Sequence, residues 1–135
     1  MNKRKVLFLC TGNSCRSQMA EAIVNARLGE KWEAYSAGTK PAGYVHPKAL
    51  AALDEIGIQH NGRSKLADEF RGVEFDLVVT VCDSAAEECP LWLGKGKRVH
   101  RGFPDPAKTD KMEDFRAVRD DLARELTALL EDYEH

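Results

Sequence analysis

The segment from Cys10 to Ser17 brings together a thiol, a run of small or polar side chains and a guanidinium. An apolar run ends at Cys10, five residues follow, and Arg16 stands where a helical pattern begins. A loop that leads onto a helix N-terminus points backbone N–H groups inward, and these donors together with the helix dipole favour a tetrahedral oxyanion. The same positive surroundings stabilise a thiolate, so Cys10 is the candidate nucleophile.

The other residues of this loop have uses of their own in holding an oxyanion. The planar fork of Arg16 can bind two oxygens and stabilise charge that builds in a transition state. Gly12 is expected to let the chain curl, and the Ser17 hydroxyl is expected to donate to the Cys10 sulfur. A buried, inert cysteine before an ordinary turn is the simpler interpretation, but it leaves the agreement of spacing and strand-to-helix context unexplained. The predicted oxyanion-binding residues are Thr11, Gly12, Asn13, Ser14, Cys15, Arg16 and Ser17.

Two further cysteines, Cys82 and Cys89, flank a short segment directly after the strongest strand pattern. A second thiol can attack the sulfur of a covalent adduct, and a third can move the resulting disulfide outward if the segment between them is mobile. The alternatives are two structural cysteines or a zinc site. Zinc is disfavoured and no metal site is predicted, because the chain has no Cys-x-x-Cys pair and its histidines lack ligand spacing. These histidines are His46, His60, His100 and His135.

The elements that must position these residues alternate between strand and helix patterns. Alternation of this kind favours an α/β fold: a four-stranded parallel sheet with right-handed crossovers and helices on both faces, in three layers. Ligands of such sheets bind at the carboxyl ends of the strands, where the cysteines and Asp105 fall. The predicted strands are Lys5–Leu9, Trp32–Ser36, Phe75–Val81 and Lys97–His100, and the predicted helices are Ser17–Leu28, Pro47–Ile56, a brief helix over Ser64–Phe70, and Asp114–Tyr133.

Length and composition limit the classes of function. The 135 residues suit a single domain spanning 1–135, and the net charge of -2 disfavours nucleic acid or an anionic membrane as partner. No apolar run approaches the roughly 18 residues that a membrane span requires, and the apolar stretch Val6–Leu9 is too short for a signal peptide. Cysteines in a chain without such a signal indicate reduced thiols and a cytoplasmic protein. Without an obvious extra apolar stripe we expect a monomer.

The sequence resembles the low-molecular-weight tyrosine phosphatase superfamily over nearly its whole length. The resemblance lies in a cysteine, five residues and an arginine near the N-terminus, with an Asp-Pro pair late in the chain. It implies the phosphatase-like, flavodoxin-like form of the α/β fold. It also implies that Cys10 is the nucleophile, that Arg16 binds the oxyanion, and that Asp105, next to Pro106, is the general acid.

The extra thiols make the sequence similar to the thioredoxin-coupled arsenate reductases of that superfamily. This resemblance implies a relay in which Cys10 attacks arsenate, Cys82 attacks the adduct and releases arsenite, and Cys89 attacks Cys82. Thioredoxin would then reduce the final disulfide, and no bound cofactor is expected. Phosphate or sulfate would act as analogue ligands in place of arsenate.

The resemblance also concerns a cation. Asn13, Glu21 and Ser36 match positions that, in some relatives, hold a potassium ion together with an acidic residue. Lys65 stands at that acidic position here. An ammonium could replace the cation electrostatically, so we expect no dependence on potassium.

Two other functions stay open from the sequence. One is a tyrosine phosphatase whose extra thiols only protect Cys10 by reversible disulfide formation. One observation argues against an aromatic substrate. The Asp-Pro pair is followed by Ala107-Lys108-Thr109, where the phosphatases usually have aromatic residues. The other is a protein without catalytic activity that binds oxyanions or senses redox state.

Overall fold

The computed structural model describes residues 3–82 and 97–133. Its four strands form one parallel sheet, as the alternating pattern predicts, and the structure gives their order as β2-β1-β3-β4. The strands are β1 (Arg4–Cys10), β2 (Trp32–Gly38), β3 (Leu77–Thr80) and β4 (Lys97–His100). The helices are α1 (Arg16–Arg27), α2 (Pro47–Glu55) and α3 (Met112–Tyr133), with short 3-10 turns η1 (Ala67–Phe70) and η2 (Pro106–Lys108).

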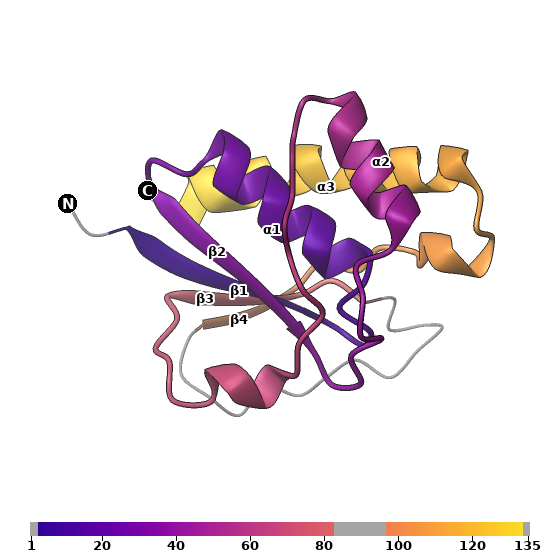
Figure 1. Ribbon diagram of the computed structural model, residues 1–135. Coiled ribbons are helices and arrows are strands. Elements are labelled where there is room, and N and C mark those ends of the chain that lie inside the picture. Colours follow the sequence, from indigo (N-terminus) through magenta and orange to yellow (C-terminus); the bar gives the residue numbers. More distant parts are fainter. Residues whose placement is uncertain (1–2, 83–96, 134–135) are drawn as a thin grey trace.

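The two faces of the sheet are covered unequally (Figure 1). All three α-helices pack together on one face, where Phe8 and Val79 meet helix residues such as Phe115 in the main hydrophobic core. Among the described residues, the other face is covered by η1 and its flanking segment, which bury Leu7 and Leu9. Helical structure therefore lies on both faces, but its bulk lies on one. Within α1, Ala26 is exposed although it lies three residues after the buried Ile23.

The central strand brings Cys10, the candidate nucleophile, to the carboxyl edge of the sheet. β1 is flanked on both sides by parallel neighbours, and its residues from Val6 to Cys10 are buried. A strand covered on both faces is apolar throughout, which explains why its pattern does not alternate. Cys10 is the last residue of β1, so the chain leaves the sheet directly into the predicted oxyanion loop.

The described residues include no helix long and apolar enough to cross a membrane.

Candidate active site

The loop from Cys10 to Ser17 wraps around the sulfur of Cys10. The Asn13 backbone N–H donates to Cys10 Sγ at 3.2 Å, and Ser17 Oγ lies 2.9 Å from the same sulfur. Cys10 is 2% exposed and carries a free thiol. Since α1 begins at Arg16, its first N–H groups lie beside the loop, where a helix N-terminus favours an anion.

Asn13 holds the shape of this loop. Its φ of 48° is left-handed, a conformation that asparagine tolerates better than most residues. Its side-chain oxygen accepts from Gln18 Nε2 at 3.0 Å and from the Lys65 backbone N–H at 2.9 Å, and its Nδ2 donates to Ser17 Oγ at 2.7 Å. The curl expected at Gly12 is therefore made at Asn13, because Gly12 has no positive φ and a Cβ there would meet only Ala42, at 4.0 Å.

Arg16 and Asp105 meet at the loop. Arg16 is 4% exposed; its Nη1 donates to the Phe103 carbonyl at 3.2 Å, and its Nη2 lies 3.9 Å from Asp105 Oδ2. The other Asp105 oxygen accepts from the Ala107 N–H at 3.0 Å, which orients the carboxylate at the start of η2. Cys10, Arg16 and Asp105, the three residues to which the resemblance gives roles, thus lie around the same loop.

These residues line one pocket of about 200 Å³. Tyr44 and His46 line it as well, although no sequence pattern pointed to them. The sequence feature that could have pointed to His46 is its position directly before Pro47, at the start of a predicted helix. Nothing in the sequence tied that helix start to the loop of Cys10.

Cys15 lies in the same pocket but differs chemically from Cys10. It is 5% exposed, and burial, reinforced by the nearby Asp105 charge, raises the pKa of its thiol to about 12. A thiol that stays protonated at neutral pH is a poor nucleophile, which agrees with assigning Cys15 no chemical step.

Cys82 lies two residues beyond β3, at the strand end beside Cys10. Its neighbour Val81 donates its N–H to the Leu9 carbonyl at 2.9 Å and accepts from the Phe103 N–H at 3.2 Å. Cys82 is fully buried, belongs to the same hydrophobic cluster as Cys10, and is disulfide-bonded. Cys89 lies outside the described residues.

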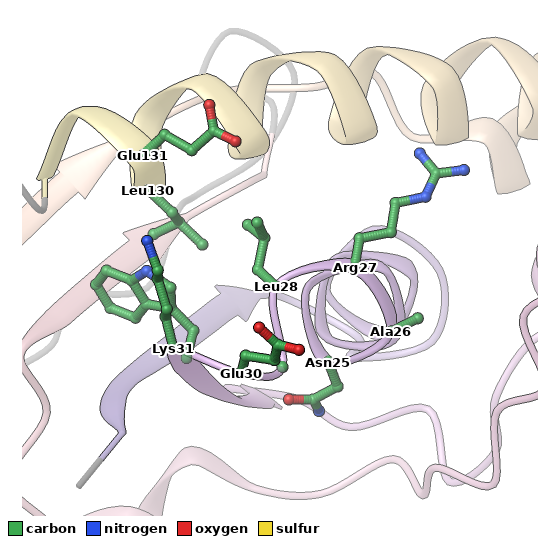
Figure 2. Close-up of a pocket in the computed structure, with 10 residues that line it drawn as sticks. Asn25, Ala26, Arg27, Leu28, Glu30, Lys31, Leu130 and Glu131 are labelled. Carbon is green, nitrogen blue, oxygen red and sulfur yellow. The ribbon is translucent and has the colours of Figure 1, made fainter. Parts of the chain in front are cut away.

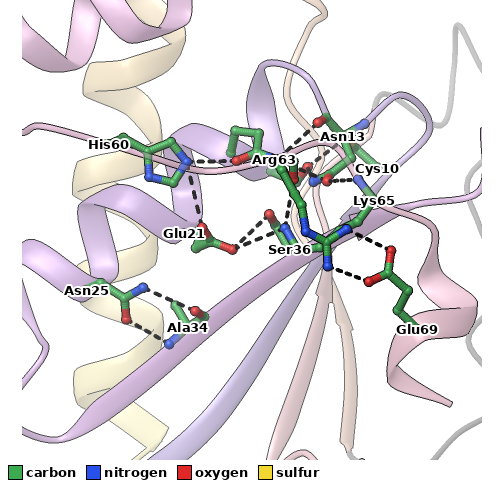
Figure 3. A network of polar contacts seen from close by, with 12 residues as sticks. Cys10, Asn13, Glu21, Asn25, Ala34, Ser36, His60, Arg63, Lys65 and Glu69 are labelled. Carbon is green, nitrogen blue, oxygen red and sulfur yellow. Dashed lines mark hydrogen bonds and ion pairs between the residues drawn. The ribbon is translucent and has the colours of Figure 1, made fainter. Parts of the chain in front are cut away.

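A mostly buried cluster of polar side chains around Glu21 and Lys65 lies next to the oxyanion loop (Figure 3). Glu21 accepts from Ser36 Oγ at 3.0 Å, and its Oε1 lies 3.8 Å from Lys65 Nζ. Lys65 Nζ also donates to the Arg63 carbonyl at 2.9 Å, and its side chain is 10% exposed. Burial lowers the pKa of Lys65, while the charge of Glu21 opposes this shift. Lys65 is therefore a buried partner of Glu21, not a surface lysine.

His60 completes this cluster and was missed from the sequence. Its Nε2 lies 2.7 Å from Gln18 Oε1 and 3.7 Å from Glu21 Oε2. Burial lowers the pKa of His60, with the Glu21 charge acting in the opposite direction. Gln18 in turn donates to Asn13, so the cluster reaches the loop through an amide.

Among residues 3–82 and 97–133, no three histidine, cysteine or carboxylate side chains are grouped so as to hold a metal ion.

Comparison with known proteins gives one consistent result. The profile of the low molecular weight phosphotyrosine protein phosphatase family matches residues 5–135. An arsenate reductase of Halalkalibacterium halodurans is 44% identical over 137 residues, covering 97% of this chain and 98% of the relative.

Solved structures agree with the sequence relatives. A crystal structure of arsenate reductase from Archaeoglobus fulgidus superposes with a TM-score of 0.81 at 31% identity, over 92% of this chain and 97% of the other. A thioredoxin-dependent arsenate reductase of Corynebacterium glutamicum superposes with a TM-score of 0.69 at 29% identity, over 96% of this chain and 62% of the other. With the cysteine loop, the arginine and the late aspartate in one pocket, the chain belongs to the low molecular weight phosphotyrosine protein phosphatase family.

Proposed function

We propose that this protein reduces arsenate to arsenite through a relay of Cys10, Cys82 and Cys89, with thioredoxin as the final reductant. The observation that carries the proposal is the buried Cys10 thiol at a pocket that Arg16 and Asp105 also line. Its curated relatives named arsenate reductase, which match nearly end to end, support this substrate. Arsenate and phosphate share a tetrahedral shape and charge, so phosphate or sulfate should compete for the pocket.

The first step is attack of the Cys10 thiolate on the arsenic atom. A sulfur–arsenic bond forms while one arsenate oxygen leaves as water. Asp105, 3.9 Å from Arg16, is positioned to deliver a proton to that oxygen. Arg16 and the loop N–H groups hold the remaining oxygens, and the Ser17 hydroxyl stabilises the sulfur before attack.

The second step transfers two electrons to arsenic. The Cys82 thiolate attacks Cys10 Sγ, a disulfide forms between them, and the electron pair of the sulfur–arsenic bond stays on arsenic. Arsenic is thereby reduced from the pentavalent to the trivalent state and leaves as arsenite. Support for this step comes from the backbone ties of Val81 to Leu9 and Phe103, which keep the Cys82 strand end beside the loop.

The third step would return Cys10 to its thiolate form. Cys89 attacks Cys82, so that the disulfide passes to this pair and the Cys10 sulfur departs. Cys10 and Cys15 are free in this structure whereas Cys82 is disulfide-bonded, a state compatible with the end of the relay. The thioredoxin-dependent relative from Corynebacterium glutamicum supports a thioredoxin dithiol as the reductant of that disulfide.

The test is an assay that couples arsenate reduction to NADPH through thioredoxin and thioredoxin reductase. Arsenate should drive NADPH loss in the wild type, and Cys10→Ser, Cys82→Ser and Cys89→Ser should each abolish it. Retained turnover in Cys89→Ser would remove that residue from the relay and point to direct reduction of a Cys10–Cys82 disulfide.

The second candidate is a phosphatase, favoured by the family match itself. It requires Cys10, Arg16 and Asp105 but not the later thiols. Hydrolysis of an aryl phosphate that survives in Cys82→Ser, without any arsenate-dependent NADPH loss in the wild type, would establish this function in place of the reductase.

A further inference from the structure

His46 contacts three separate segments around the pocket. Its backbone N–H donates to the Ser14 carbonyl of the oxyanion loop at 3.0 Å. Its ring nitrogen Nδ1 accepts the Lys48 N–H at 3.1 Å and so caps the N-terminus of α2. Its side chain is 15% exposed and lines the pocket. One residue therefore joins the loop, the helix and the pocket wall.

These contacts fix the tautomer and direction of the ring. Because Nδ1 accepts a hydrogen bond, the proton of the neutral imidazole must lie on Nε2. Nε2 lies 3.4 Å from Asp110 Oδ1, and the ring packs against Phe115 with centroids 4.7 Å apart. The packed imidazole thus keeps Nε2 close to the Asp110 carboxylate.

Asp110 is the far end of the segment that carries the candidate acid. Its N–H donates to the Pro106 carbonyl at 3.0 Å, and η2 connects it to Asp105, whose Oδ1 caps Ala107. Asp110 has a φ of 57°, and Lys48 Nζ lies 3.0 Å from its Oδ1. The position of Asp110 therefore influences where the Asp105 carboxylate stands.

We propose that His46 is a positioning residue that holds the acid loop, residues 105–110, against the oxyanion loop. Its main chain anchors it to the oxyanion loop, and its Nε2–H anchors the acid loop through Asp110. The charged groups around it are Lys48 and Asp110 at its edge, with Arg16 and Asp105 in the same pocket. The consequence for turnover rests on the proposed function, in which Asp105 delivers a proton. Lys48 also contacts Asp110, so loss of the His46 contact should make the acid loop more mobile without detaching it from α2.

Two conservative substitutions separate the two roles of the ring. In His46→Asn the amide oxygen can replace Nδ1 as the helix cap, but the side chain is too short to reach Asp110. In His46→Gln the amide nitrogen can replace Nε2–H, but the cap on Lys48 is lost. Asp110→Gly removes the acceptor while tolerating the positive φ.

The first readout is hydrogen exchange of the Ala107 amide measured by NMR, with the Asn13 amide as internal reference. In His46→Asn and in Asp110→Gly, Ala107 should exchange about tenfold faster, since its bond to Asp105 opens more often, while Asn13 stays protected. His46→Gln should keep wild-type exchange at Ala107 but unfold at a lower temperature. The double variant His46→Asn with Asp110→Gly should exchange no faster than Asp110→Gly alone, because Asp110→Gly already removes the contact with His46.

The second readout is arsenate turnover. His46→Asn should lower kcat about three- to tenfold and leave KM nearly unchanged, because Arg16 and the loop donors still bind the oxyanion. If His46→Gln loses turnover and loop protection while His46→Asn keeps both, His46 acts only as a helix cap and the proposal is wrong. Wild-type exchange at Ala107 in both variants would overturn it too. The exchange measurement needs no turnover, so it stands even if the chain proves not to reduce arsenate.

Discussion

Two of the pockets in the described part of the chain contrast in size and in chemistry. The larger, about 440 Å³, lies where α1 ends, between the start of β2 and the end of α3 (Figure 2). Its charged side chains are exposed, and in Figure 2 those of Arg27, Glu30 and Glu131 lie apart from one another. The smaller, about 200 Å³, lies at the carboxyl ends of the strands and contains Cys10 and a buried Arg16.

This difference shows that volume alone does not identify a reactive site. The small pocket is lined by the Cys10 thiol, the buried Arg16 guanidinium, the Asp105 carboxylate and the N-terminus of α1, whereas the large pocket lies at a helix C-terminus. The negative end of the helix dipole there disfavours an anion. Among the described residues, the side chains suited to binding a tetrahedral oxyanion line the small pocket, so that is where we place the chemistry.

The substitution with the largest expected effect is at Arg16, the arginine of the small pocket. Arg16→Lys keeps the charge but loses the planar fork and the hydrogen bond to Phe103. We expect arsenate kcat/KM to fall about 100-fold, the usual cost of losing one oxyanion donor. The NADPH-coupled assay measures this, and a thermal unfolding scan controls for folding. A loss of less than threefold would place oxyanion binding elsewhere.

The next effect concerns Cys15 and pH. Its pKa is raised from 9.0 in the unfolded reference to about 12 when folded, so the folded state keeps a proton that the unfolded state loses. The contribution of Cys15 to the free energy of unfolding should therefore be fully present below pH 9. It should be lost between pH 9 and 12, by up to about 1.4 kcal/mol per pH unit. Urea unfolding across this range should show a shallower decline in Cys15→Ala than in the wild type. Identical slopes would contradict the burial of a protonated Cys15.

A smaller effect tests the ammonium beneath the loop. We propose that Lys65, paired with Glu21, replaces a monovalent cation. The wild type should therefore show the same unfolding temperature in potassium and in sodium chloride. Lys65→Asp places a second carboxylate beside Glu21, so potassium should raise its unfolding temperature by a few degrees, as a ligand of the folded state does. A potassium response of the wild type would remove the assigned role of Lys65.

The smallest effect is expected at the large pocket. Arg27→Lys is matched to the first substitution, because both arginines lie on α1 and the same group is exchanged. Arg27 is exposed, and substitutions at such positions seldom change stability by more than about 0.5 kcal/mol. Arsenate kcat/KM should stay within about twofold of the wild type. A loss comparable to that of Arg16→Lys would mean that the large pocket takes part in the reaction.

Much of the fold followed from local patterns. The apolar run before Cys10 predicted β1 because a strand buried on both faces needs no polar residue, and the spacing from Phe115 to Leu126 predicted α3 because one helix stripe must face the core. β3 is shorter than predicted, Leu77–Thr80, since Phe75 packs under the sheet beside η1 without joining the ladder. The family could also be recognised from the sequence, because Cys10, Arg16 and the Asp105-Pro106 pair match its motif.

By itself, the sequence determined the element order, the parallel sheet and the candidate residues of the loop, because hydrophobic periodicity, helix capping and residue type act within a few neighbouring positions. Only the tertiary structure decided that Asn13 rather than Gly12 bends the loop, that His60 and Lys65 support it, and that His46 reaches both the loop and Asp110. Those contacts join residues far apart in the chain. They depend on where β1, α2 and the acid loop meet at one edge of the sheet, and no local pattern of residue types encodes such a meeting.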